Sequence, residues 1–182
     1  MNKTVKRLCV TAVMLALATV LNDIVPHFEM PLGGSVTPLS MLPIVVLPIM
    51  FGTKWGIASA FIFSIIQLLF GLSEGILGWG MTPIALIGMI VFDYILAYTL
   101  LGLAGVFANK GIKGIALGVI LVCVLRFICH FISGCTFCAS WSAWDNVYAY
   151  SFCYNGAYML PELILTTIAA TALSKRLTTI LK

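Results

Sequence analysis

Long apolar runs separated by short polar connectors dominate this chain. They cover residues 8–25, 36–51, 56–72, 81–107, 114–134 and 148–173. A transmembrane helix needs about 20 apolar residues, and most of the runs approach that length. The second run contains Pro38, Pro43 and Pro48, so we expect its helix to be kinked or interrupted. The pattern predicts an all-α integral membrane protein with six transmembrane helices, folded as a single domain over residues 1–182.

Charged residues in the connectors and at the chain ends mark the two sides of the predicted membrane. Basic groups alternate along the chain with acidic groups, and one apolar run separates each group from the next. Because loops rich in Lys and Arg stay in the cytoplasm, both termini are predicted to be cytoplasmic. The basic groups are Lys3/Lys6/Arg7, Lys54, Lys110/Lys113 and Lys175/Arg176/Lys182, and the acidic groups are Asp23/Glu29, Glu74 and Asp145.

Composition supports the membrane assignment and limits the partners. Apolar residues make up 62% of the chain, charged residues 9%, and the mean hydropathy is +1.12, which argues against a soluble domain. The net charge of +4 is scattered over the connectors, so lipid is the expected surface partner and nucleic acid is not. The basic start resembles a signal peptide, but residues 8–21 are long for one and no cleavage site follows, so we predict a retained helix.

Cysteines are the next candidates for chemistry. Cys135 and Cys138 form the only closely spaced pair of the six, and His130 lies five residues before Cys135. A metal site would need a second pair of ligands, so we predict no metal. A disulfide or a metal at this pair is the alternative.

Three charged residues outside these groups, Asp93, Arg126 and Glu162, fall inside apolar runs. Each such group costs about 2.5–3.5 kcal/mol at the centre of a bilayer, so they indicate function. Arg126 and His130 are one turn apart and share a helix face, about 12 Å and about 6 Å below the outer end. Asp93 lies about 15–18 Å below the same surface. These depths predict a pocket open to the outside; an Asp93–Arg126 ion pair that only holds helices together is the alternative.

The last apolar run adds further polar and aromatic residues at this depth. Tyr150 and Asn155 lie near its outer end. Glu162 follows on the same face as Asn155, and we expect it to have a structural role or to pair with a group on the fifth span. Trp141 and Trp144 precede it in the outer connector. These tryptophans suit either an interfacial belt or a flat cationic ligand that stacks on aromatic rings.

The first span carries small residues at helical spacing. Ala12 and Ala16 are one turn apart, and such a stripe lets another helix approach closely. It fits packing inside the bundle or docking of a partner subunit.

Four segments together resemble the thiamine-specific substrate-binding (S) components of energy-coupling factor (ECF) transporters. They are MPLGGSVTPLSMLP, DYILAYTLLGLAGVF, RFICHFISG and YSFCYNGAYMLPE. The resemblance implies a six-helix subunit that binds thiamine from outside. It also implies docking on a transmembrane coupling protein with two ABC-type ATPases.

The resemblance further implies roles for particular residues. Asp93 would bond the aminopyrimidine of thiamine, and the substrate-binding set would be Asp93, Tyr94, Arg126, His130, Tyr150 and Asn155. Ala12 and Ala16 would dock the coupling protein. A helix-five tryptophan found in some members is missing near Cys138, and we expect Trp141 to replace it, with Trp144 as the alternative.

Other functions stay open on the sequence alone. The nearest is an S component for another vitamin or for the pyrimidine precursor of thiamine. An intramembrane enzyme would need a nucleophile beside His130, where the chain offers Cys129, Ser133 or Cys135. A purely structural subunit would fill the pocket with its own side chains.

Overall fold

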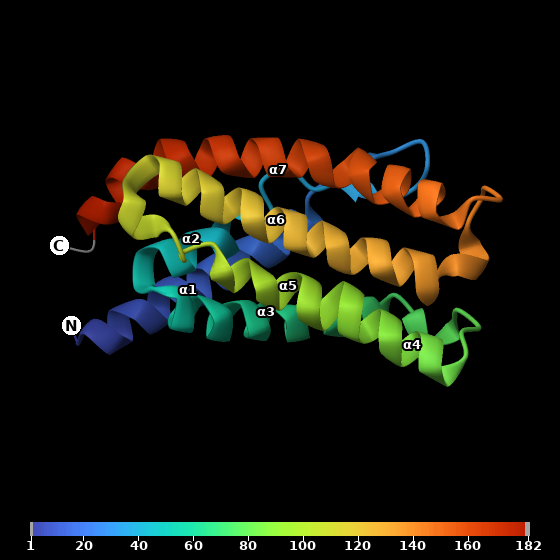
Figure 1. Ribbon diagram of the computed structural model, residues 1–182. Helices are drawn as coiled ribbons and strands as arrows, with labels where there is room; N and C mark the ends of the chain where they lie inside the picture. The colour runs from blue at the N-terminus through green and yellow to red at the C-terminus, as the bar shows by residue number, and fades with distance from the viewer. Residues whose placement is uncertain (1, 181–182) are drawn as a thin grey trace.

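The computed structural model describes residues 2–180, and their side chains as far as residue 173. The predicted basic group Lys175/Arg176/Lys182 therefore lies outside the described side chains. The chain forms an elongated bundle of helices (Figure 1). Within the described residues, five helical segments are long and apolar enough to cross a membrane: Lys3–Ile24, Thr53–Ser73, Pro83–Leu103, Ala108–Thr136 and Val147–Leu173. These segments confirm a helical membrane fold.

The first third of the chain leads from α1 through a small hairpin into α2 and α3. Helix α1 (Lys3–Thr19) continues directly into a π-helical turn, η1 (Val20–Ile24). Strands β1 (Phe28–Glu29) and β2 (Ser35–Val36) pair antiparallel, with Phe28 opposite Val36. Helices α2 (Leu42–Phe51) and α3 (Thr53–Ser73) follow.

The remainder begins with a segment whose helix type changes repeatedly. After the 3₁₀ turn η2 (Ile76–Gly78) come α4 (Pro83–Met89), the π-helical turn η3 (Ile90–Leu96), α5 (Ala97–Thr99) and the 3₁₀ turn η4 (Leu100–Leu103). A further 3₁₀ turn, η5 (Ala108–Lys110), leads into α6 (Gly111–Thr136). The turn η6 (Ala139–Trp141) precedes α7 (Val147–Ile180). Helix α1 begins and α7 ends at the same end of the bundle (Figure 1).

Helix α2 is shorter than the second predicted span. That span was expected over residues 36–51, but the helix begins at Leu42. Pro38 disfavours helical backbone at Thr37, and Leu39 has a positive φ of 63°. At 1.5 Å per residue, a ten-residue helix rises about 15 Å, roughly half of a bilayer core. Helix α2 is therefore too short to cross a membrane by itself.

Helix α2 forms the centre of the core. It is buried from Pro43 to Met50, and Ile44, Val45 and Leu47 are fully buried. It contacts α1, α3, α7 and η4. A helix that is apolar on every side is expected to be enclosed by its neighbours. The outer faces of the other helices are also apolar, with exposed side chains such as Ile84, Ile168 and Val13, as contact with lipid requires.

Candidate ligand-binding site

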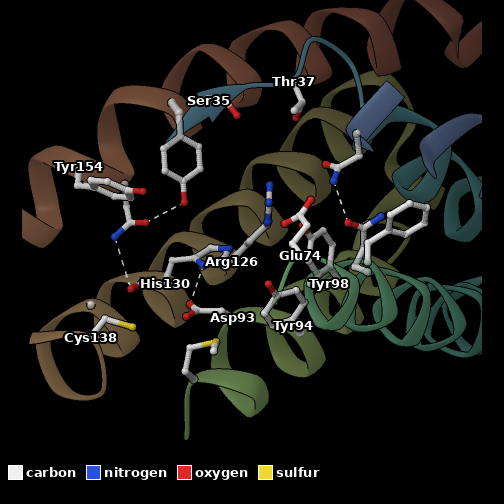
Figure 2. A pocket seen from close by; sticks show the side chains of 18 of the residues that line it. Ser35, Thr37, Glu74, Asp93, Tyr94, Tyr98, Arg126, His130, Cys138 and Tyr154 are labelled. Carbon is white, nitrogen blue, oxygen red and sulfur yellow. Dashed lines mark hydrogen bonds and ion pairs between the residues drawn. The ribbon is translucent and has the colours of Figure 1, made fainter. Parts of the chain in front are cut away.

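A cavity of about 610 Å³ lies between the helices and the hairpin (Figure 2). Its walls come from η1, β2, α3, α4, η3, α5, α6, η6 and α7 and from the connectors between them. The structure brings together every residue that the sequence analysis proposed for ligand binding. They line this one cavity: Asp93, Tyr94, Arg126, His130, Trp141, Tyr150 and Asn155.

Asp93 lies in the π-helical turn η3 and is bonded to α6. Its Oδ1 lies 2.8 Å from His130 Nδ1, and its Oδ2 accepts a hydrogen bond of 2.5 Å from the Ser133 hydroxyl. These bonds hold the carboxylate in position. The other ring nitrogen of His130, Nε2, is buried and has no hydrogen-bond partner among the described residues. Asp93 and His130 thus form one polar wall of the cavity. In this wall, His130 Nε2 is available to bond a ligand.

Arg126 does not pair with Asp93, which was one alternative drawn from the sequence. Its Nη1 lies 3.2 Å from Glu162 Oε2, and the two side chains are almost completely buried. The guanidinium also sits 4.9 Å from the centre of the Tyr98 ring. Breaking a buried pair of this kind is costly because it leaves a charge without a partner. The pair links α6 to α7.

Glu162 also binds the segment that leads into α2. Its Oε1 accepts a hydrogen bond of 3.1 Å from the Thr37 backbone N–H and another from the Thr37 hydroxyl. The hairpin next to Thr37 packs on α7, since a side chain added at Gly33 or Gly34 would collide with the rings of Tyr154 and Tyr158. The connector between α1 and α2 is therefore fixed over the cavity.

Asn155 and Tyr150 are both held by bonds within the cavity wall. Asn155 is 5% exposed. Its Nδ2 donates to the Ser151 carbonyl at 2.9 Å, and its Oδ1 accepts from the Tyr158 hydroxyl at 2.8 Å. The Tyr150 hydroxyl donates to the Leu32 carbonyl at 3.2 Å. Tyr150 therefore ties α7 to the hairpin loop, while Asn155 is held facing α6.

The two outer tryptophans have different surroundings. Trp141 lines the cavity and meets Trp79 edge to face, with ring centres 5.2 Å apart. Trp144 instead packs against Tyr150 at 5.7 Å and is not part of the cavity lining. The geometry thus favours Trp141 over Trp144 as the ring that a ligand would meet.

The sequence analysis missed part of the cavity wall. Asp23 was assigned to a connector, and Asn22 and Gln67 were not singled out, yet all three line the cavity and are bonded to one another. A glutamine inside an apolar run was the available signal for Gln67. The cavity side of α7 also includes Tyr154 and Tyr158, which the sequence analysis did not name.

The cysteines form no disulfide in the structure. No group of three or more His, Cys, Asp or Glu suited to a metal ion occurs among the described residues. Burial, reinforced by the negative charge of Asp93, raises the pKa of the Cys138 thiol to about 11. This thiol therefore stays protonated at neutral pH.

Ala12 and Ala16 lie on the outside of the bundle. Both are exposed, whereas Ala18, two residues further along α1, is fully buried. The small-residue stripe thus faces away from the core. This position is compatible with the docking expectation and does not fit packing inside the bundle.

The fold and the cavity define a multi-pass helical membrane protein with a pocket for a small polar molecule. Residues 8–182 match the family described as thiamine transporter protein (Thia_YuaJ), so the chain belongs to this family. It is 30% identical over 181 residues to the thiamine transporter ThiT of Bacillus subtilis (strain 168), with 92% of this chain and 89% of that protein covered.

Two solved structures are similar in fold. One is ThiT from Listeria monocytogenes, with a TM-score of 0.77 and 22% sequence identity. The other is the S component of a bacterial ECF transporter, with a TM-score of 0.61 and 21% identity. Each alignment covers 99% of both chains.

Proposed function

We propose that this chain is the thiamine-binding S component of an ECF-type vitamin importer. The observation that carries the proposal is one cavity, in a member of the thiamine transporter family, that is lined by Asp93, His130 and Asn155. Thiamine has a flat aminopyrimidine with donors and acceptors along one edge. A carboxylate, an imidazole and an amide can bond such an edge. In this role the chain is a transport subunit rather than an enzyme.

The proposal includes a topology and partners. Six passes through the bacterial cell membrane, with both ends in the cytoplasm, agree with the alternation of basic and acidic connectors. In this topology α2 and the segment before it make the second pass. The subunit docks on a transmembrane coupling protein that works with two ABC-type ATPases. Residues 1–182 act as one substrate-binding domain.

Thiamine added to the detergent-purified chain should quench its tryptophan fluorescence, with one thiamine bound per chain. The reason is that Trp79 and Trp141 line the cavity. Titration calorimetry gives the affinity independently. If micromolar thiamine produced no quenching and no heat, thiamine would be excluded as the ligand. Tighter binding of the hydroxymethylpyrimidine precursor than of thiamine would move the assignment to that compound.

Trp141→Phe and Trp144→Phe should behave differently. We expect the Trp141 change to weaken thiamine binding and reduce quenching, because Trp141 lines the cavity. The Trp144 change should leave affinity near that of the parent, because Trp144 packs on Tyr150 outside the lining. Fluorescence titration of the two variants measures this. Equal affinity of both variants and the parent would assign both rings to the membrane interface.

Ala12→Trp and Ala16→Trp should stop transport without stopping binding. Both alanines are exposed on α1, so a larger side chain leaves the core intact but blocks close approach of another helix. ATP-dependent thiamine uptake, measured in vesicles with the energising module, should be lost while calorimetry shows parental affinity. The matched control is Val13→Trp, at a large, exposed side chain on the same helix. Normal uptake by both alanine variants would contradict the docking role.

A further inference from the structure

Asp23 is a cavity-lining carboxylate that is held by neutral groups. It lies in the π-helical turn η1. Its Oδ2 accepts a hydrogen bond of 2.8 Å from Gln67 Nε2, and its Oδ1 accepts one of 3.1 Å from Asn22 Nδ2. Asn22 also donates to Gln67 Oε1 at 2.8 Å, and Gln67 is only 3% exposed. The amides fix the position of this carboxylate without cancelling its charge.

The other charges around the cavity are distributed differently. Among the described residues, the ion pairs are Arg126 with Glu162 and His130 with Asp93. Asp23 and Glu74 therefore reach the cavity wall with no basic partner. Glu74 is exposed, where water screens its charge. Asp23 is only half-exposed, so a cation in the cavity would interact more strongly with Asp23.

Tyr94 lines the cavity between Asp93 and helix α3. Gln67 and Gly71 are one turn apart and share a face of α3. A side chain at Gly71 would collide with the Tyr94 ring and hydroxyl, so the Tyr94 ring packs directly on α3 next to the Asp23 cluster. Asp93, the residue before Tyr94, is bonded to α6 instead. One side thus presents an uncompensated carboxylate, and the other presents the Asp93–His130 pair.

The α6 side is suited to a hydrogen-bonding group. Arg126 Nε and His130 Nε2 are buried there without a partner among the described residues, and Arg126 is only 6% exposed. Buried polar nitrogen atoms of this kind require a bond from a ligand or from water. Arg126 Nε can only donate and therefore needs an acceptor, and a cationic heterocycle with neither an N–H group nor a free nitrogen lone pair offers no such bond. It is stabilised by a counter-charge and an aromatic face instead.

We infer that Asp23, held by Gln67 and Asn22, is the counter-ion for the cationic thiazolium ring of thiamine. The aminopyrimidine then lies on the side of Asp93 and His130. This inference rests on the proposed function and deepens it, because it assigns selection for positive charge to one residue. An ionisable residue within a membrane helix is a recognised place for a ligand counter-ion.

The test compares thiamine with deazathiamine, a neutral isostere in which carbon replaces the thiazolium nitrogen. Calorimetry on the full chain in detergent measures both affinities for the parent and for Asp23→Asn. We expect Asp23→Asn to bind thiamine about tenfold or more weakly, as for the loss of a close charge pair. Its affinity for deazathiamine should stay within about twofold of the parent's, since a neutral ring does not interact with the missing charge. Retained isostere binding also shows that the variant is folded.

Two further variants make the outcome unambiguous. Asp23→Glu keeps the charge, so it should keep the preference for thiamine over deazathiamine even if both affinities fall. Glu29→Gln removes an exposed acidic residue outside the cavity lining and should change neither affinity. Equal weakening of both affinities in Asp23→Asn, or no change in either, would overturn the inference, while the proposed thiamine-binding function would still stand. A parent chain that binds no thiamine would instead refute the proposed function, and the inference with it.

Discussion

Asp93→Ala should weaken thiamine binding by about 1.5–4 kcal/mol, which is more than tenfold in affinity. The change removes a carboxylate that lines the cavity and leaves His130 Nδ1 and the Ser133 hydroxyl without their partner. Both effects act at the place where we propose the aminopyrimidine binds. Titration calorimetry on the purified variant measures the loss. His130→Ala and Asn155→Ala should fall in the same range.

Asp145→Ala is the matched control for this prediction. It deletes the same type of side chain from the outer connector, where Asp145 is exposed and does not line the cavity. Its thiamine affinity should equal that of the parent. Parental affinity in all three cavity variants would show that the ligand binds elsewhere.

Glu162→Ala should be the most destabilising of the changes considered. It leaves the buried Arg126 guanidinium without its ion-pair partner and removes the acceptor for the Thr37 backbone N–H. Removing one member of a buried pair costs about 3–5 kcal/mol. Unfolding by SDS titration in mixed micelles, followed by tryptophan fluorescence without ligand, measures the loss.

The double variant Arg126→Met/Glu162→Met tests the cause. It removes both charges and puts apolar side chains in their place, so it should be more stable than Glu162→Ala. If the double variant were the less stable of the two, the cost would come from lost packing rather than from an unpaired charge.

Much of the cavity followed from spacing along single helices. The depth of Asp93 and the one-turn separation of Arg126 and His130 depend only on helix rise and period, and these residues do line one cavity. The partner of Arg126 depended on how α6 and α7 are rotated about their axes, which no single-helix pattern contains. The family resemblance is confirmed by the match over residues 8–182.

The errors at α2 and η1 each concern one end of a predicted span. The apolar run before Leu42 looked helical, but the Thr37 N–H bonds Glu162, which is distant in sequence, rather than a helical carbonyl. Asp23 was placed in a loop because an acidic residue at the end of an apolar run usually marks one. The backbone instead continues as a π-helical turn and brings Asp23 to Gln67. Both outcomes depend on tertiary contacts that periodicity does not reveal.

The two π-helical turns also bear on how such a pocket is acquired during evolution. Asp23 and Asp93 each lie in one of them. A π-helical turn closes its hydrogen bond one residue later than an α-helical turn, so a single inserted codon is enough to create it. Each residue of an α-helix turns by about 100°, so deleting one residue from 90–96 would rotate the flanking helix faces against each other. Length changes of one residue in these turns should therefore be rare among thiamine-binding relatives, even where the surrounding apolar residues vary freely.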